Sequence, residues 1–233
     1  MFRKFVELIP NTLTCGNLVS GCLAIFFAFH GTEVYGCLSG YAWACVMIGL
    51  AAVFDFCDGA AARLLKAFSP LGADLDSLSD LVSFGVAPGM LMLNLVLDNS
   101  PYAWMAAVCA LIPVCGALRL ARFNVDTDQA TVFRGLPIPA NAIFWIGVYG
   151  WISRYGFPHS AFLLVFLVLI PLSMVGRFKM LSLKFSNFYL RDNFLRYVLI
   201  AGTLFFVLCY GLSGLVWTIL LYFGMSLGAQ KRL

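Results

Sequence analysis

The sequence predicts an all-α, polytopic membrane protein, a bundle of about eight transmembrane helices. Of its 233 residues, 62% are hydrophobic and only 11% are charged. A soluble domain has about twice that share of charged residues, so this chain has too few polar side chains to cover a water-exposed surface. The same composition argues against a disordered chain. A net charge of +4, with scattered basic residues, argues against nucleic-acid binding.

Charged residues interrupt the apolar sequence and mark the expected spans. Eight stretches carry no charge, and with their flanks each approaches the length of one helical span, about 20 residues. Turn-forming residues, mainly Gly, Pro, Asn and Asp, lie between them. The stretches are residues 13–28, 34–54, 81–97, 102–118, 140–153, 161–175, 197–210 and 212–227.

The distribution of Lys and Arg predicts the orientation in the membrane. Fourteen of the 15 basic residues fall at the two ends of the chain and in alternate loops, and only Arg154 falls on the other side. Cytoplasmic loops of membrane proteins carry an excess of Lys and Arg. We therefore expect a multi-pass protein of the cell membrane with both termini in the cytoplasm.

Four aspartates at helical spacing form the strongest candidate site. Asp55 and Asp58 are three residues apart, and Asp76 and Asp80 are four apart, so each pair would share one face of a helix. A helix hairpin that turns near residues 69–72 would bring the pairs together at the cytoplasmic boundary. Oxygen ligands favour hard cations such as Mg²⁺ or Mn²⁺. Four aspartates suit a two-metal site for phosphoryl displacement.

The residues around the first pair fit the same chemistry. Gly59 and Ala62 continue the helical stripe of Asp55 and Asp58 and leave room for a bulky substrate. Arg63 adds a cation that can bind phosphate oxygens. The competing explanation is that the aspartates are solvated at a cytoplasmic turn, and Asp74, which lies off the shared face, fits that explanation equally well.

The pattern D-x2-D-G-x2-A-R-x8-G-x3-D-x3-D is matched in full over residues 55–80. It resembles the signature of the CDP-alcohol phosphotransferases. That family implies a core of six transmembrane helices, a homodimer and two divalent metals. Its members transfer a phosphoalcohol or phosphatidyl group from a CDP-linked donor to an alcohol and release CMP.

Further segments resemble the members of the family that use serine. They are IPNTLTCGNLVSG, DSLSDLVSFGVAP, RLARFN and FRGLPIPAN, all within residues 9–141. The resemblance implies metal-dependent transfer of a phosphatidyl group from CDP-diacylglycerol to L-serine, which gives phosphatidylserine and CMP. The same chemistry with glycerol 3-phosphate as acceptor stays open. A six-helix core would occupy residues 1–193, and residues 194–233 would form an added transmembrane hairpin.

The resemblance also implies roles for individual residues. Asp80 would be the general base that takes the proton from the acceptor hydroxyl. Two divalent cations, Mg²⁺ or Mn²⁺, would be held by Asp55, Asp58, Asp76 and Asp80. The CDP-lipid would be contacted by Asn11, Thr14, Gly59, Ala62, Arg63 and Gly72. Asn17 stands where several relatives with other acceptors carry an arginine.

The acceptor site is predicted from the polar residues at the end of one span. Arg119, Arg122 and Asn124 end the fourth span on the expected active-site face. One of them could hold the carboxylate of serine through a charge-assisted hydrogen bond. The arginines could equally be cytoplasmic anchors that fix the topology.

Two other classes of membrane protein share part of this pattern. Acidic residues within the membrane often mark ion pathways, but these aspartates fall at a boundary rather than at the midplane. A membrane prenyltransferase also uses two aspartate-rich motifs and Mg²⁺, but its motifs lie far apart in sequence. Release of CMP from a CDP-linked lipid in the presence of serine would separate a phosphatidyltransferase from both.

Overall fold

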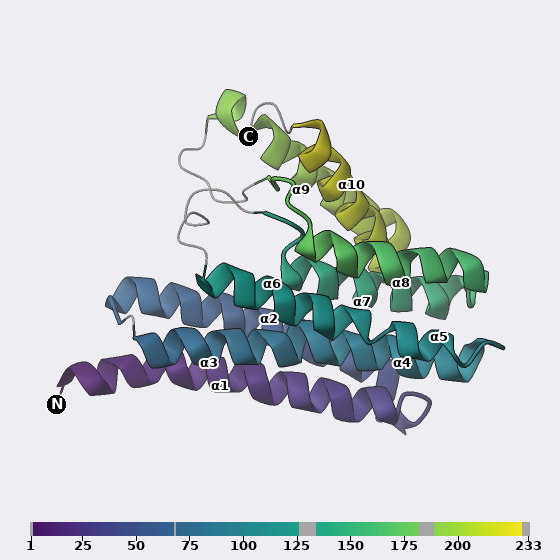
Figure 1. Ribbon diagram of the computed structural model, residues 1–233, viewed down its shortest axis with the longest axis horizontal. Helices are drawn as coiled ribbons and strands as arrows, with labels where there is room; N and C mark the ends of the chain where they lie inside the picture. The colour runs from purple at the N-terminus through teal and green to yellow at the C-terminus, as the bar shows by residue number, and fades with distance from the viewer. Residues whose placement is uncertain (1, 68, 126–133, 182–188, 230–233) are drawn as a thin grey trace. The chain divides into compact units, whose positions relative to one another are not determined.

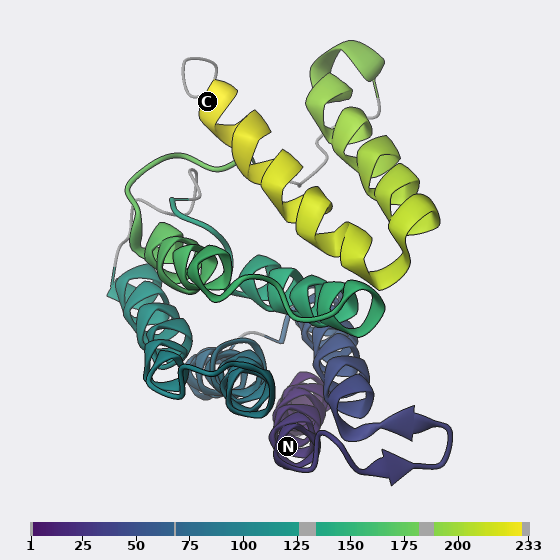
Figure 2. The ribbon, with the colours of Figure 1, turned by 90° about the vertical axis from the view of Figure 1, so that its right-hand side faces the viewer.

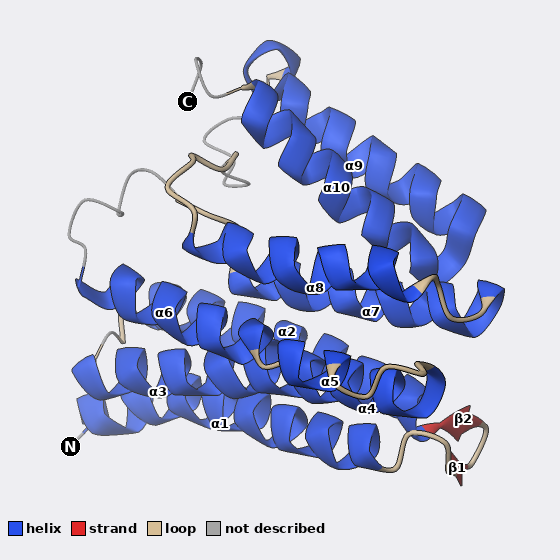
Figure 3. Cartoon of the chain, turned by 45° about the vertical axis from the view of Figure 1, so that its right-hand side comes forward, coloured by secondary structure: helices blue, strands red, loops and turns tan. Residues whose placement is uncertain are grey.

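The computed structural model describes residues 2–67, 69–125, 134–181 and 189–229. Within these residues the fold is helical apart from loops, one isolated β-bridge and one short hairpin, in which β1 (Val34–Tyr35) pairs antiparallel with β2 (Leu38–Ser39) (Figure 3). The prediction of an all-α membrane bundle is confirmed at this level.

The chain divides into two compact units, Met1–Leu120 and Ala121–Leu233. The helices of the first unit run side by side in Figure 1. They are α1 (Phe2–Phe29), α2 (Gly40–Leu65), α3 (Pro70–Asp80), the π-helix η1 (Leu81–Val86), α4 (Ala87–Asn99), α5 (Met105–Val108) and most of α6 (Leu111–Val125).

In the second unit, the described residues form four helices of 15 residues or more and the 3-10 turn η3 (Gly211–Ser213). The chain turns at η3, so that α9 and α10 pack against each other as a hairpin (Figure 2). Helix α7 contacts both α8 and α10. The four helices are α7 (Ile138–Tyr155), α8 (Ser160–Val175), α9 (Leu190–Tyr210) and α10 (Gly214–Gly228).

Helix α1 is the centre of packing in the first unit, because it contacts α2, α3, η1 and α4. Its buried face carries small or polar residues at helical spacing, a pattern that lets helices approach closely in a membrane. Gly21 marks one such close approach, since a Cβ built there would lie 2.9 Å from the Cα of Ser83 in η1. The buried residues of this face are Pro10, Thr14, Asn17, Ser20, Gly21, Ala24 and Ala28.

The turn between α2 and α3 lies earlier than the predicted residues 69–72. Helix α2 ends at Leu65 and is capped by Lys66, which takes a left-handed conformation with φ 51°. The hydroxyl of Ser69 accepts a hydrogen bond from the Gly72 backbone N–H at 3.1 Å, and Pro70 occupies the first turn of α3. Ser and Pro at these two positions favour a helix start, so Gly72 already lies inside the helix.

Five stretches of the described residues are long and apolar enough to cross a membrane. The last of them contains both α9 and α10, and α8 is a shorter apolar helix. The class of polytopic membrane protein therefore holds, whereas the predicted number of eight spans stays a prediction. The stretches are Leu8–Phe29, Gly40–Leu65, Pro70–Asn99, Met105–Val125 and Asn193–Gly228.

The close contact at Gly21 gives a stability prediction. Gly21→Ala should lower the midpoint of thermal unfolding, because its methyl group would overlap the Ser83 backbone, and overpacking of this kind costs about 1–3 kcal/mol. Gly49→Ala is the matched control, since no atom lies within 4 Å of a Cβ built there. Thermal unfolding of both variants is measured in the same nanodisc. An unfolding midpoint for Gly21→Ala as high as that for Gly49→Ala would contradict the packing argument.

Candidate metal centre and active site

Three of the four predicted carboxylates converge. Asp55 comes from α2, and Asp76 and Asp80 come from successive turns of α3. One carboxylate oxygen from each of the three residues lies within 4.8 Å of the other two. All three side chains are half-buried. The α2–α3 hairpin therefore creates a group of oxygen donors from residues that are up to 25 positions apart in sequence.

Asp58 has a different environment. Its side chain is buried, and its Oδ2 accepts a hydrogen bond from the Thr14 hydroxyl at 2.7 Å. Thr14 Oγ1 also lies 3.0 Å from the Pro10 carbonyl oxygen of its own helix. The contact ties the first aspartate pair to α1 and orients the Asp58 carboxylate.

Asn17 orients the other end of the cluster, a role that the sequence reasoning missed. It is fully buried on α1, and its Nδ2 donates to Asp80 Oδ1 at 3.3 Å. Its backbone carbonyl accepts a hydrogen bond from the Ser83 hydroxyl at 3.0 Å. One feature of the sequence could have indicated this role. Asn17 shares a helical face with Gly21 and Ala24, so a polar amide lies at a buried position where an apolar residue is normal.

The π-helix η1 begins directly after Asp80. Insertions of this kind occur often at functional sites because they change the direction of the side chains that follow. Here η1 brings the Ser83 hydroxyl to the Asn17 carbonyl. The segment after Asp80 is therefore hydrogen-bonded to α1, the helix whose Asn17 side chain also contacts Asp80. Sequence periodicity does not reveal this irregularity.

The carboxylate cluster fits a divalent cation. Within the described residues, the buried Asp76 Oδ1 has no hydrogen-bond partner. A buried carboxylate oxygen without a partner is costly unless it is ionically compensated. Oxygen donors in this number and spacing are typical ligands of hard divalent ions. The residues present therefore match the metal chemistry that the sequence pattern implied.

The residues predicted to contact the CDP-lipid include Gly59 and Ala62, two positions of α2 with little or no side chain. A Cβ built on Gly59 would have only Arg63 Nη2 near it, at 3.9 Å. Arg63 is exposed, and its Nε donates to the Gly59 carbonyl at 2.9 Å. Ala62 is half-buried on the same helix. This part of α2 is consequently free of bulky side chains along its stripe.

Gly72 has a different reason to be small. A Cβ there would lie 3.0 Å from Asn11 Oδ1 and 3.1 Å from Ser69 Oγ. The start of α3 therefore approaches α1 closely at this point. Asn11 and Gly72, both predicted near the CDP-lipid, are neighbours in the structure.

The predicted acceptor residues are divided between the two units. Arg119 is half-buried in the part of α6 that belongs to the first unit, whereas the exposed Arg122 and Asn124 belong to the second. Arg122 Nη1 donates to the carbonyl oxygen of Val175, the last residue of α8, at 3.0 Å. This contact gives Arg122 a structural role, and binding of an acceptor by any of the three stays a prediction.

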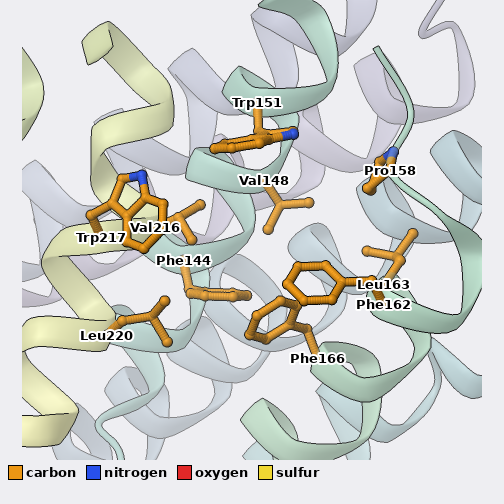
Figure 4. A pocket seen from close by; sticks show the side chains of 10 residues that line it. All are labelled: Phe144, Val148, Trp151, Pro158, Phe162, Leu163, Phe166, Val216, Trp217 and Leu220. Carbon is orange, nitrogen blue, oxygen red and sulfur yellow. The ribbon is translucent and has the colours of Figure 1, made fainter. Parts of the chain in front are cut away.

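A pocket in the second unit lies between α7, α8 and α10 and has a volume of about 280 Å³ (Figure 4). Side chains such as Phe144, Trp151 and Trp217 line it, and none of its described lining residues is charged. The described side chains that line the pocket include no acid or base that could move a proton. The pocket is therefore not a candidate for the reaction centre.

Residues 7–208 match the model of the CDP-alcohol phosphatidyltransferase family. Because this match covers most of the chain, the protein belongs to that family. The match ends within α9, beyond the predicted boundary at residue 193.

Individual relatives carry one common name, CDP-diacylglycerol–serine O-phosphatidyltransferase. The Bacillus subtilis protein is 41% identical over 132 residues, which cover 56% of this chain and 69% of the relative. The Methanocaldococcus jannaschii protein is 34% identical over 196 residues, 75% of this chain and 86% of the relative. The Mycobacterium leprae protein is 35% identical over 159 residues, and this chain spans about half of its length, 49%.

The unpartnered oxygen of Asp76 predicts its contribution to metal binding. Asp76→Asn should weaken Mn²⁺ binding by about tenfold or more, because an amide supplies less charge to a hard cation. Asp74→Asn, an exposed neighbour outside the cluster, is the control and should bind Mn²⁺ like the unmodified protein. Calorimetric titration of the purified protein measures both, and equal affinities for the two variants would remove Asp76 from the ligand set.

Proposed function

We propose that this protein transfers a phosphatidyl group from CDP-diacylglycerol to the hydroxyl group of L-serine. The products are phosphatidylserine and CMP. The observation that carries the proposal is the convergence of Asp55, Asp76 and Asp80 within the full family motif. The printed names of the relatives support serine as the acceptor over glycerol 3-phosphate.

The reaction is a direct displacement at the phosphorus atom that carries the diacylglycerol. The serine hydroxyl oxygen forms a bond to this phosphorus, and the bond to the oxygen that bridges the two phosphates breaks. That oxygen leaves with CMP. Asp80 takes the proton of the serine hydroxyl, as a general base within hydrogen-bond reach of its substrate. The hydrogen bond from Asn17 holds the Asp80 carboxylate in position during this transfer.

The four motif aspartates would hold two divalent cations, Mg²⁺ or Mn²⁺. Cations bound there would neutralise charge on the diphosphate and stabilise the leaving oxygen. Asp76 has an oxygen without a hydrogen-bond partner. Its carboxylate lies close to those of Asp55 and Asp80. Asp58 contributes through the carboxylate that Thr14 orients. Asp80 thus serves both as a metal ligand and as the base.

The donor occupies the open stripe of α2. Gly59 and Ala62 leave space for the cytidine diphosphate group, and Arg63 supplies a cation beside it. Asn11 and Gly72 complete the donor site where α3 begins, close to α1. The diacylglycerol chains stay in the bilayer, which the apolar helices of the protein share.

The topology that goes with this function has eight spans and both termini in the cytoplasm. The positive-inside distribution of Lys and Arg supports this orientation. It puts the aspartates on the cytoplasmic side, where serine is dissolved. We further propose a homodimer, as the family resemblance implies, and a division into a core of residues 1–193 and an added hairpin of residues 194–233.

An acceptor screen tests the proposed function. Purified protein with CDP-diacylglycerol and Mn²⁺ should release CMP when L-serine is added, and should release little with glycerol 3-phosphate. Mass spectrometry should identify phosphatidylserine as the lipid product. Asp80→Asn should lower turnover at least about 100-fold, because the amide cannot take the proton. Faster release with glycerol 3-phosphate would assign the other acceptor, and no release with any acceptor would remove the transferase function.

Gly59 gives a test of the donor site that separates binding from folding. Gly59→Leu should abolish transfer, because its side chain would occupy the stripe that receives the nucleotide. Thermal stability should change little, since a Cβ at residue 59 approaches only Arg63 Nη2, at 3.9 Å. A stable variant with normal turnover would show that the stripe does not face the donor.

Arg122 distinguishes an acceptor site from a helix contact. If Arg122 binds the serine carboxylate, Arg122→Ala should raise the KM for serine about 10- to 150-fold, with little change in the KM for the donor. Arg122→Lys should recover part of this loss, because Lys lacks the planar fork of Arg. If its contact with Val175 is its whole role, both KM values should stay constant and thermal stability should fall.

A further inference from the structure

A second, larger groove lies within the second unit, between α7, α9 and α10. Its volume is about 690 Å³, within the range typical of ligand sites. Helix α9 forms its longest wall, from Arg196 at one end to Val207 at the other. Pro139 of α7 and Tyr222 of α10 contribute to the other walls. The groove is separate from the aromatic pocket of Figure 4, with which it shares no lining residue.

The walls of the groove are hydrocarbon along nearly their whole length. The hydroxyls of Thr203 and Thr218 donate to carbonyl oxygens of their own helices, at 2.8 and 3.1 Å, so their methyl groups remain to contact a ligand. The Tyr222 hydroxyl donates to the Leu181 carbonyl at 2.9 Å. Among the described residues that line the groove, Arg196 alone is charged. A long apolar surface with one cation at its end matches an amphiphile with an anionic head.

The dimensions of the groove match one leaflet of a bilayer. Arg196 and Val207 are 11 residues apart on one helix, which corresponds to about 16 Å at a rise of 1.5 Å per residue. Half of the hydrocarbon core of a membrane is about 15 Å thick. An acyl chain that lies along α9 would therefore keep its headgroup phosphate at the level of Arg196.

We infer that this groove binds an intact anionic phospholipid, with one acyl chain along α9 and the phosphate at Arg196. A guanidinium presents a planar fork of N–H donors that suits phosphate oxygens. Basic positions between transmembrane helices are known sites for anionic lipid headgroups. Arg196 Nη1 donates to Asn193 Oδ1, one turn earlier on α9, and this contact holds the guanidinium at the end of the groove. The lipid is retained rather than consumed, so the site is additional to the proposed transfer.

Native mass spectrometry of the purified full chain tests the site. Dioleoyl phosphatidylglycerol and dioleoyl phosphatidylcholine are added in equal amounts, so that only the headgroup differs. The unmodified protein should retain phosphatidylglycerol over phosphatidylcholine by at least about tenfold, as expected for one charge-assisted contact. Arg196→Gln should lose this preference, and Arg196→Lys should keep part of it. No CDP-linked lipid is present, so the result is independent of the proposed transferase function.

Two control variants make the experiment specific to the groove. Arg191→Gln removes an exposed cation of the same helix that does not line the groove, and it should keep the full preference. Thr203→Phe should fill the groove and reduce retention of both lipids, whereas Thr203→Val, with nearly the same shape, should retain them. Thermal unfolding of each variant checks that it is folded.

Three outcomes would overturn the inference. A lipid preference of Arg196→Gln equal to that of the unmodified protein would exclude a phosphate contact at this residue. Equal losses in Arg191→Gln and Arg196→Gln would indicate a general surface-charge effect. A change in the monomer–dimer ratio of Thr203→Phe, with unchanged lipid retention, would show that a second copy of the chain covers the groove.

Discussion

The first unit is organised around the need to hold several carboxylates together in an apolar helix bundle. Like charges at this spacing repel, and low-dielectric surroundings strengthen the repulsion. Two features of the bundle limit the cost. Polar groups of α1, Thr14 and Asn17, donate to Asp58 and Asp80. The remaining oxygens, including the unpartnered one of Asp76, have the arrangement that a divalent cation compensates.

This requirement explains why α1 has so few large side chains on its buried face. Donors as short as Thr and Asn reach a carboxylate on a neighbouring helix only if the backbones are close. Gly21 allows that approach at η1, where a side chain would meet the Ser83 backbone. The hydrogen bond from the Ser83 hydroxyl to the Asn17 carbonyl also holds α1 and η1 together at this contact. Small residues, which drive helix contact in membranes, thus also set the geometry of the site.

The sequence predicted the parts of the structure that depend on local spacing. Charge-free stretches indicated a membrane bundle. The intervals within the pairs Asp55/Asp58 and Asp76/Asp80 indicated one cluster of four carboxylates, three of which the structure groups together. It did not predict what depends on contacts between distant residues. The hydrogen bond of Asn17 joins residues 63 positions apart. The turn was predicted a few residues too late because the left-handed Lys66 ends α2 without the glycine that usually marks such a position.

The four aspartates of the motif are spaced almost symmetrically in sequence, yet the structure makes them unequal. Asp58 is buried with an oxygen committed to Thr14, whereas Asp76 keeps a buried oxygen without a partner. Asp80 receives one neutral donor, Asn17, which orients the carboxylate without neutralising its charge. A carboxylate that is oriented by a neutral donor, rather than paired with a fixed cationic side chain, is suited to accept a proton. The different roles proposed for these residues therefore follow from their neighbours on α1, not from their positions in the motif.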